Sequence, residues 1–456
     1  MVADDQFTKL SLIKEGVYLI QEKYIFTNNV QSLAPAGKWS TLKKKTKGFG
    51  EMRKTLVLIT AVVLVLVSAL VVFAAPEKLV VWADQGEVPT FEKIATEFTK
   101  QTGIAVEFVE IGMLDQRQKL ALDGPAGKGP DVFTTPHDLV GQMAIMGLME
   151  PLVVADDVLD QFTPASIQAL SFDGDLYGLP WATESTALYY NKDIFPEIPE
   201  TFEELVAMAK AVTSGDQYGL LFDIGDFYFS HAFFVGKGGY VFAPLEGGGL
   251  NPSDVGLAKH GGIAALDFLK SLVTDGIIPI GTNTGIAQSL FLEGKVGAII
   301  SGPWYLAEPR ALEAEGKLNF GVAPLPPFAS GVRPSPFSGV KGFYISSYSQ
   351  YPAEAQQLIE FLTGRDGGFL IYKERAQIPT RYDIMEMKEF QEDDDVYNFA
   401  LQGGYATPMP NIPEMQAVWG NIADAINLVI NENVDPAIAL ELAVEMIEEA
   451  IMEMQR

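Results

Sequence analysis

Hydrophobic positions follow two different patterns along this chain. Residues 56–73 form an almost unbroken apolar run, interrupted only by Thr60 and Ser68. From about residue 78 onward, the chain alternates between two kinds of segment. Some are short runs that are apolar or alternate apolar with polar residues, and the others are longer stretches whose apolar residues recur every three or four positions. Short β-like runs that alternate with amphipathic helical stretches predict an α/β fold with parallel strands.

This periodicity predicts most elements of the part after residue 75. Strands are expected, in chain order, at 79–82, 104–111, 131–133, 295–300, 318–323 and 341–346. The first helix is expected at 89–101, where four apolar side chains share one face: Phe91, Ile94, Ala95 and Phe98. A second should run to Val212 from a capping box formed by Thr201 and Glu204, and a third should cover 352–363.

A long C-terminal helix and an acidic turn complete the predicted elements. Asp435 is the expected cap of the helix and Pro436 its first residue. Its apolar stripe is predicted to pack in the core, and consists of Ala439, Leu442, Met446, Ala450 and Met454. The three consecutive aspartates at 393–395 are expected to form a solvated turn.

The long apolar run has the flanks of a secretion signal. Met52-Arg53-Lys54 supplies a basic start, and Val72-Phe73-Ala74 supplies the small-x-small pattern that signal peptidase reads. We therefore predict a signal peptide at 52–74, cleaved to leave Ala75 first, and export of the remainder. Residues 1–51 are interpreted as an upstream extension, translated from a start codon chosen too early. The alternative is that the run is retained as a membrane anchor, because it is just long enough to span.

Charge and composition exclude several classes of function. The chain carries 59 acidic and 32 basic residues, for a formal net charge of −27. Such a chain is repelled by a phosphate backbone or an anionic membrane, so no nucleic acid partner is expected. The sequence contains no cysteine. This excludes cysteine proteases, thiolate metal sites and lipid attachment through cysteine, and it favours a periplasmic location.

Motifs for catalysis, metals and cofactors are missing. The chain has no G-x-S-x-G elbow, no H-E-x-x-H pair and no Rossmann glycine fingerprint. Its three histidines, His137, His231 and His260, are too widely spaced to indicate a metal site. We predict no catalytic residue, no metal and no cofactor.

Tryptophan beside carboxylates is the pattern that points to a ligand. Trp82 is followed by Asp84, Trp181 by Glu184, and Trp304 comes directly after a predicted strand. Ligands of open α/β sheets bind at the carboxyl ends of strands. A pyranose has an apolar face that stacks on an indole ring and a rim of hydroxyls that carboxylates accept. The joint pattern favours a neutral sugar, although each tryptophan alone could equally be core packing.

Eight short segments, taken together and in order, resemble one known family. They are 78–82, 102–104, 129–132 with 136–138, 184–193, 238–240, 291–295, 302–304 and Met409-Pro410-Asn411-Ile412-Pro413. Over nearly all of 77–456 the chain is similar to the maltose/maltodextrin-binding proteins of bacterial ABC importers. The resemblance implies a two-lobed periplasmic-binding-protein fold, in which each lobe is a mainly parallel sheet flanked by helices.

The resemblance also implies how the chain is divided. The N-terminal lobe would comprise 75–185 and 338–390, and the C-terminal lobe 186–337 and 391–456. A hinge of several crossings would join them near 183–186, 338–342 and 389–394.

Position by position, the family pattern implies a set of sugar-binding residues. Trp304, Trp419 and Tyr228 would stack on sugar rings, and Glu184, Asp138 and Asp226 would accept their hydroxyls. Two further positions match the family, Asp84 at the end of the first strand and Met409 beside a stacking ring.

The chain also departs from the family pattern near one end of the groove. An acidic residue followed by lysine is replaced by Gly86-Glu87, an aromatic by Thr135, and an arginine by Leu139. These changes remove one ring and two cationic donors. Glu87 remains a candidate contact, and Trp181 could supply a substitute ring.

These observations predict a periplasmic receptor, monomeric and not an enzyme. It would close on maltose- or maltotriose-type maltodextrins and deliver them to an ABC importer permease. One alternative is a receptor for a different oligosaccharide or small solute. The other is an exported glycosidase that uses Glu184 with Asp138 or Asp84 as its carboxylate pair, since the sequence does not exclude the required spacing.

Overall fold

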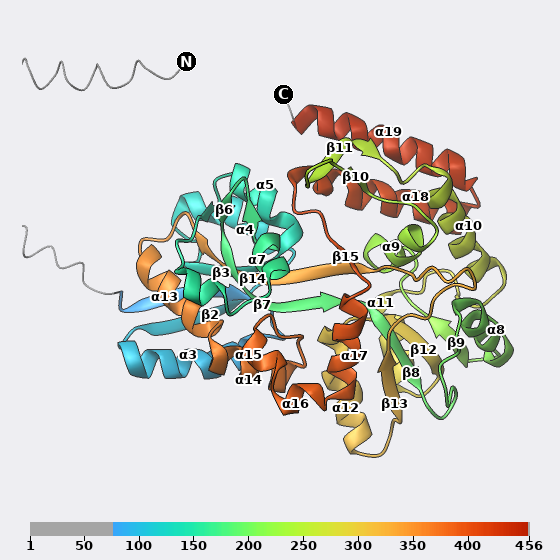
Figure 1. The fold of residues 1–456 in the computed structure, drawn as a ribbon, viewed down its shortest axis with the longest axis horizontal. Coiled ribbons are helices and arrows are strands. Elements are labelled where there is room, and N and C mark those ends of the chain that lie inside the picture. The colour runs from blue at the N-terminus through green and yellow to red at the C-terminus, as the bar shows by residue number, and fades with distance from the viewer. Residues whose placement is uncertain (1–75, 455–456) are drawn as a thin grey trace, which may run out of the picture. The chain divides into compact units, whose positions relative to one another are not determined.

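Two β-sheets, each with its own helices, organise the protein in the computed structural model (Figure 1). The structure describes residues 76–454. The predicted upstream extension and signal peptide, 1–51 and 52–74, lie outside the described residues. Among the residues that are described, no helix is both long and apolar enough to cross a membrane.

The larger sheet mixes parallel and antiparallel strands. Its order is β15-β14-β3-β1-β2, and β4 and β7 also pair with β14. The pairs β1–β2, β1–β3 and β14–β15 are parallel, whereas β14 is antiparallel to β3, β4 and β7. The strands are β1 (Lys78–Ala83), β2 (Ala105–Glu110), β3 (Val132–Pro136), β4 (Met149–Glu150), β7 (Gly178–Ser185), β14 (Phe337–Ser346) and β15 (Thr407–Pro408).

The smaller sheet has the order β13-β8-β12-β9, in which only the β12–β9 pair is parallel. Its strands are β8 (Ala187–Asn191), β9 (Tyr218–Leu221), β12 (Val296–Ser301) and β13 (Phe320–Ala323). Two separate hairpins are formed by β5 (Ser171–Phe172) with β6 (Asp175–Leu176), and by β10 (Phe242–Pro244) with β11 (Leu250–Val255). The two-lobed α/β architecture is as expected, but its sheets are more mixed than the predicted mainly parallel ones.

Helices surround both sheets. Those of the larger sheet are α3 (Val88–Thr102), α4 (Gln116–Asp123), α5 (Val140–Ile145), α6 (Asp156–Leu159), α7 (Pro164–Ala169), α13 (Pro352–Leu362), α14 (Arg365–Arg375), α15 (Tyr382–Met385) and α16 (Lys388–Gln391), with short 3₁₀ helices η1 (Gly124–Ala126) and η2 (His137–Leu139). Those of the smaller sheet are α8 (Phe202–Val212), α9 (Phe227–Gly236), α10 (His260–Thr274), α11 (Thr284–Leu292), α12 (Ala307–Ala314), α17 (Asp394–Gly403), α18 (Val418–Glu432) and α19 (Pro436–Met454), with η3 (Pro303–Tyr305) and η4 (Pro413–Ala417).

Most of the predicted elements are confirmed. The face of α3 predicted from periodicity is buried, with Phe91 fully enclosed. The capping box of α8 is also present, because Thr201 accepts from the Glu204 N–H while the Glu204 carboxylate accepts from the Thr201 N–H. At α19, Asp435 caps the first turn through bonds from Ala437 and Ile438. Local signals therefore place these elements correctly.

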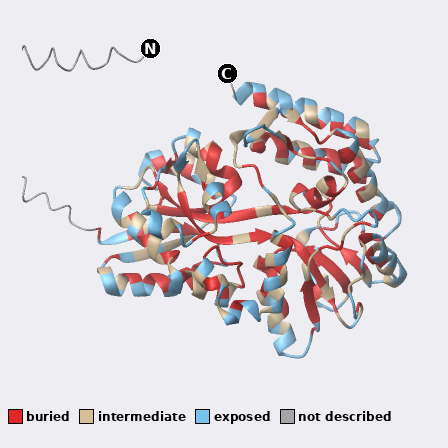
Figure 2. Ribbon diagram, in the orientation of Figure 1, coloured by how far each residue is buried: buried red, intermediate tan, exposed pale blue. Residues whose placement is uncertain are grey.

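The hydrophobic residues form separate cores for the two lobes. Two clusters draw on residues 79–182 and 340–371, and a third draws on 187–337 and 372–451. Buried strands run through the middle of both lobes, and exposed residues gather on the outer helices (Figure 2). Two long strands, β7 and β14, run antiparallel beside one another between the lobes, and Gly339 lies opposite Glu184 in their register. The site described below is built around this pair of strands.

Two local predictions were wrong. The aspartates at 393–395 are not a solvated turn, because Arg310 from α12 binds both Asp393 and Asp395, with 3.0 Å to Asp395. The Asp393 side chain also caps α17 by accepting from Val396. The pairing joins α12 to the segment between α16 and α17, and so ties together parts of the chain far apart in sequence.

The predicted apolar stripe of α19 was the second error. Ala439 is buried, but Leu442, Met446 and Met454 are each nearly half exposed. The residues that pack inward are instead those of a neighbouring stripe, Leu440, Ala443, Ile447 and Ile451.

Candidate functional site

An ion pair between the two long strands lies at the centre of the site. The Glu184 Oε2 atom on β7 is 2.8 Å from the Lys341 Nζ atom on β14, and only 8% and 6% of the two residues is exposed. Gly339 makes the room for this carboxylate, because a Cβ there would lie 2.9 Å from Glu184 Cγ. Lys341 also stands 5.3 Å from the ring centroid of Trp181 and 5.8 Å from that of Trp304.

A second charged group follows the end of β1. Glu87 is 5% exposed and its Oε2 atom lies 3.5 Å from Arg375 Nε, at the end of α14. Asp84 orders the loop between them by accepting from the Gly86 and Met113 N–H groups. Gly86 lets Arg375 approach, since a Cβ there would lie 3.1 Å from its guanidinium.

Asp138 is held by residues near the end of the chain. Its Oδ2 atom accepts hydrogen bonds from Trp419 Nε1 at 3.1 Å and Gln416 Nε2 at 3.3 Å. The neighbouring His137 fixes this arrangement: its Nδ1 accepts from the Val340 N–H, so its Nε2 carries the proton and donates to the Met409 carbonyl. Val340 lies within the predicted crossing 338–342, and Met409 directly follows β15.

The three predicted stacking residues lie in one aromatic cluster. Tyr228 and Trp304 have ring centroids 6.0 Å apart, and Phe337 lies 6.2 Å from Tyr228 and 5.4 Å from Trp419. Trp304 and Trp419 are only partly buried, so both retain exposed ring surface. Aromatic residues separated by nearly two hundred positions therefore form a common wall.

Asp226 and Met409 lie at the margins of this wall. Asp226 is exposed and uses Oδ1 to cap α9, accepting from the Tyr228 N–H at 2.8 Å. This cap fixes the start of the helix that carries Tyr228. Met409 is 5% exposed, and a Cβ at Gly339 would touch its methyl group, so it lies beside the Glu184 pocket.

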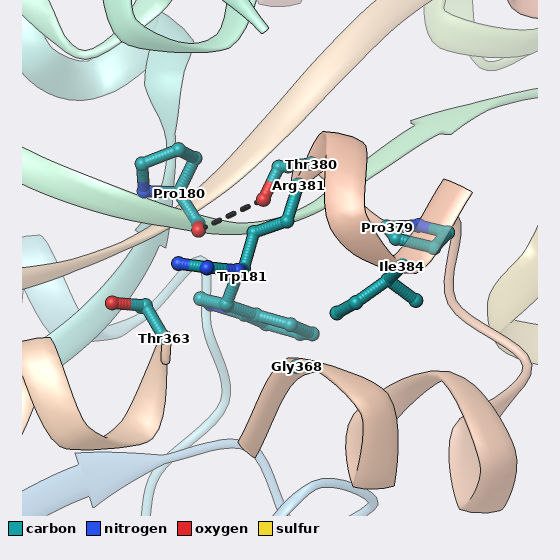
Figure 3. A pocket seen from close by; sticks show the side chains of 8 residues that line it. All are labelled: Pro180, Trp181, Thr363, Gly368, Pro379, Thr380, Arg381 and Ile384. Atoms are coloured by element: carbon teal, nitrogen blue, oxygen red, sulfur yellow. Dashed lines mark hydrogen bonds between the residues drawn. The ribbon is translucent and has the colours of Figure 1, made fainter. Parts of the chain in front are cut away.

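Trp181 is placed differently from the other tryptophans of the predicted site. It is 2% exposed and packs against Phe91 and Phe343 in the core of the larger sheet. Figure 3 shows its ring among the residues of a shallow pocket, which are Pro180, Thr363, Gly368, Pro379, Thr380, Arg381 and Ile384. This pocket leaves no room for a water molecule. The proposal that Trp181 replaces a missing stacking ring stays a prediction.

Burial and neighbouring charge set the protonation of these groups. Burial raises the pKa of Asp138 to about 6, partly offset by the hydrogen bonds from Gln416 and Trp419. Burial also raises the pKa of Glu87, although Lys341 and Arg375 oppose it. Burial acts to lower the pKa of Lys341, but the Glu184 and Glu87 carboxylates outweigh it and the pKa is raised. The lysine is therefore a permanent cation in the site.

Several buried polar atoms of the site have no hydrogen-bond partner among residues 76–454. They include Glu87 Oε2, Glu184 Oε2, Tyr228 Oη, Arg375 Nε and Trp181 Nε1. Burial raises the pKa of Tyr228 well above 10, assisted by Glu184, Asp138 and Asp226, so its hydroxyl remains a donor. Glu184 and Glu87 are ion-paired with Lys341 and Arg375, but buried polar atoms with so few hydrogen bonds are costly, and their concentration here marks a candidate ligand site.

Lys341, Arg375 and Gln416 belong to this site but were not predicted. Lys341 lies within the second predicted crossing, 338–342, and that placement was the only signal for it. No local motif marks Arg375 or Gln416, because their contacts with Glu87 and Asp138 join residues more than 270 positions apart. The part of the chain described by the structure holds no cluster of histidine and acidic side chains suited to a metal ion.

Comparison with known proteins agrees with a site for capturing solutes. A family model described as bacterial extracellular solute-binding protein matches residues 93–398. The chain belongs to this family. Membership of this extracellular family agrees with the export predicted from the sequence. The relatives described below are binding proteins.

Three relatives show how far the similarity extends. The galactooligosaccharide-binding protein of Bacillus subtilis (strain 168) is 34% identical over 374 residues, which cover 81% of this chain and 88% of that protein. A cyclo/maltodextrin-binding protein solved with maltotetraose is 39% identical, covers 83% of this chain and 98% of its own, and has a TM-score of 0.72. The maltotriose-binding protein of Thermus thermophilus, bound to maltotriose, is 33% identical, with 82% and 100% coverage and a TM-score of 0.76. These matches confirm the resemblance and the two-lobed fold.

Replacing Asp138 with asparagine should stabilise this solute-binding protein at neutral pH. Between pH 3.8 and about 6 the folded protein holds a proton that the unfolded chain has released. Stability from this group therefore falls as the pH rises through that window, by up to about 3 kcal/mol for a two-unit shift. Urea unfolding of Asp138→Asn and wild type at pH 4 and pH 7.5 should show a stabilisation confined to the higher pH.

The exposed Asp424 on α18 offers a matched control, and Asp424→Asn should leave the unfolding free energy within about 0.5 kcal/mol of wild type at both pH values. An equal effect of Asp138→Asn at pH 4 and pH 7.5 would contradict the buried-carboxylate explanation.

Proposed function

We propose that this protein is the receptor of an ABC importer that captures maltose- and maltotriose-type maltodextrins by closure of its two lobes. The observation that carries the proposal is the meeting, in one site, of two partly exposed tryptophans with buried carboxylates and donors that lack hydrogen-bond partners beyond their ion pairs. An indole offers an apolar face to the C–H surface of a sugar ring, and carboxylates accept its hydroxyls. Solved relatives hold maltotetraose and maltotriose.

The charge of the site supports a neutral ligand. Glu184, Glu87, Asp84 and Asp138 outnumber the cations Lys341 and Arg375. An anionic sugar or a phosphate would meet a net negative surface, whereas an uncharged saccharide needs only the acceptors. The predicted contacts Asp84, Glu87, Asp138, Glu184, Asp226, Tyr228, Trp304, Met409 and Trp419 supply both kinds of group.

A galactooligosaccharide is the second candidate ligand. It is favoured by the relative of Bacillus subtilis, which is named for that sugar and covers 81% of this chain. The changes at Thr135, Leu139 and Glu87 alter one end of the site relative to the maltodextrin pattern, which supports a modified preference there. Both candidates are neutral oligosaccharides, so they share the stacking mechanism.

The wider assignment follows from the family. We place the mature receptor in the periplasm, as a monomer that delivers sugar to the transmembrane permease of its importer. The sugar would contact side chains of both lobes only when these are closed, so binding would shift the population towards the closed form.

Calorimetric titration with maltotriose and with a galactotetraose tests the ligand. A dissociation constant in the micromolar range corresponds to about −8 kcal/mol, which is within reach of two stacked rings and a few charged hydrogen bonds. X-ray scattering with and without saturating sugar should show a smaller radius of gyration for the complex. Superimposable profiles would rule out closure, and absence of heat with both sugars would rule out the ligand class.

The glycosidase alternative requires a separate measurement. Prolonged incubation with maltotriose should return the intact trisaccharide if the protein is a receptor. Released glucose, absent from a Glu184→Gln preparation, would instead support a carboxylate-pair mechanism.

A further inference from the structure

Lys341 occupies an unusual place for a lysine. It lies on β14 with 6% of its surface exposed, and its ammonium group faces the rings of Trp181 at 5.3 Å and Trp304 at 5.8 Å. Trp304 is the middle residue of η3 in the smaller lobe, and Trp181 lies in the core of the larger lobe. A buried cation therefore stands where groups from both lobes meet.

The ion pair with Glu184 uses only part of the hydrogen-bonding capacity of the ammonium group. Glu184 Oε2 lies 2.8 Å from Lys341 Nζ and takes up one of its three protons. Within residues 76–454, no other carboxylate lies within 4.0 Å of this nitrogen. It is thus desolvated, charged and left with donors to spare, which is a strained arrangement unless another acceptor joins it.

Its distance from Trp304 places it at the rim of a stacked sugar. Carbons of a ring stacked on indole lie about 3.5–4.0 Å from it. An ammonium group over the same ring, 5.8 Å from its centroid, would stand beside such a sugar and not beyond it. A hydroxyl at the sugar's edge would then accept a charged hydrogen bond of about 2.7–2.9 Å from it.

We propose that Lys341 contacts the ligand, donating a hydrogen bond to one hydroxyl of the sugar unit stacked on Trp304 and so selecting its position. The inference rests on the proposed function. Lys341 also offers one cationic donor to a site from which the family pattern loses two, at Leu139 and Gly86-Glu87. Lys341 supplies a donor from β14, close to the same carboxylates.

The charges around Lys341 keep the donor available. Glu184 on β7, Glu87 before α3 and Asp84 after β1 all act on it, and Arg375 on α14 shares Glu87. With three carboxylates around two cations, Lys341 stays protonated and need not release one partner to bind a hydroxyl. Because these carboxylates raise the pKa of Lys341 above its ordinary value, the ammonium group remains a donor at neutral pH.

A double-mutant cycle between protein and ligand tests this contact. Wild type and Lys341→Met are titrated with maltotriose and with maltotrioses lacking one hydroxyl each. A charged hydrogen bond predicts a roughly 10–100-fold loss of affinity for one deoxy sugar in wild type. In Lys341→Met the same deletion should cost less than about 3-fold, while penalties at other hydroxyls stay unchanged. Lys373→Met, on the same helix as Arg375, is the matched control and should reproduce the wild-type pattern.

The possible outcomes distinguish failure of the Lys341 contact from failure of the proposed sugar-binding function. If wild type binds maltotriose but every deoxy penalty is the same in Lys341→Met, the contact is disproved and the proposed function stands. If wild type binds no maltodextrin, the cycle is run with a galactooligosaccharide, and failure with both removes the proposed function itself. Should Lys341→Met not fold, Glu184→Gln is compared with the Glu184→Gln, Lys341→Met double variant, in which neither charge is left unpaired.

Discussion

Alanine in place of Trp304 is expected to weaken maltotriose binding about 30-fold, and alanine at both Trp304 and Trp419 to weaken it about 1000-fold. Each ring offers an exposed face on the same aromatic wall, with Tyr228 and Phe337 between them. Loss of a stacking anchor at the centre of a site commonly costs about 2 kcal/mol or more, and two anchors on separate sugar units should add. Isothermal titration measures both constants directly.

Trp419 has a second role that a matched variant can separate. Its indole N–H donates to Asp138, so alanine removes a ring and a hydrogen bond together. Trp419→Phe keeps an aromatic face without the donor and should retain most of the affinity if stacking dominates. Tyr351→Ala, at an exposed aromatic before α13, should leave binding unchanged. Unaltered affinity in the Trp304, Trp419 double variant would disprove the stacking site.

Local signals in the sequence were sufficient for much of the fold. The capping box at Thr201 and the helical period of α3 depend on neighbours within a few positions, so they are readable without tertiary information. The resemblance then supplied the lobes and the acidic and aromatic residues of the site. Three predicted stacking residues, Tyr228, Trp304 and Trp419, do share one wall. What each of them contacts in a ligand stays a prediction.

The prediction for α19 was wrong because the sequence of this helix offers two apolar stripes with the same helical period. The stripe predicted for α19 runs through Ala439, Leu442, Met446, Ala450 and Met454, whereas the buried stripe runs through Leu440, Ala443, Ile447 and Ile451. Both repeat every three or four residues, and only packing against α18 and α10 selects the second.

Trp181 lies where the pairing of β7 with β14 is irregular, between Ala182 opposite Lys341 and Pro180 opposite Gly342. It is a core residue, although its ring stands 5.3 Å from the ammonium group of Lys341. Its predicted role as a stacking ring stays a prediction.

Long-range pairing was the part that sequence could not supply. Asp393 and Asp395 look like solvated surface until Arg310, more than eighty positions earlier, is brought beside them. The pairing of Lys341 with Glu184 likewise depends on the register of β14 against β7. That register sets Gly339 opposite Glu184 and leaves room for the carboxylate. Such pairs are properties of the sheet, not of either segment.

Glu184→Gln should lower the free energy of unfolding by about 3 kcal/mol. The substitution leaves Lys341 buried with its nearest counter-charge gone, and breaking one side of a buried ion pair costs about 3–5 kcal/mol. The lower value is expected because Glu87 and Asp84 continue to act on the lysine. Urea unfolding measures the loss, and the exposed pair Lys210–Asp275 provides a control, since Asp275→Asn should cost less than about 1 kcal/mol.

Adding Lys341→Met to Glu184→Gln should restore most of that stability, because no unpaired charge then remains inside the site. Equal stabilities of the single and double variants would show that the ion pair is not the source of the loss. The restored protein should nevertheless bind sugar poorly, since it lacks both an acceptor and the proposed donor. A protein that regains its fold but not its ligand would show that this buried ion pair is kept for binding, because an uncharged pair at the same positions would satisfy folding alone.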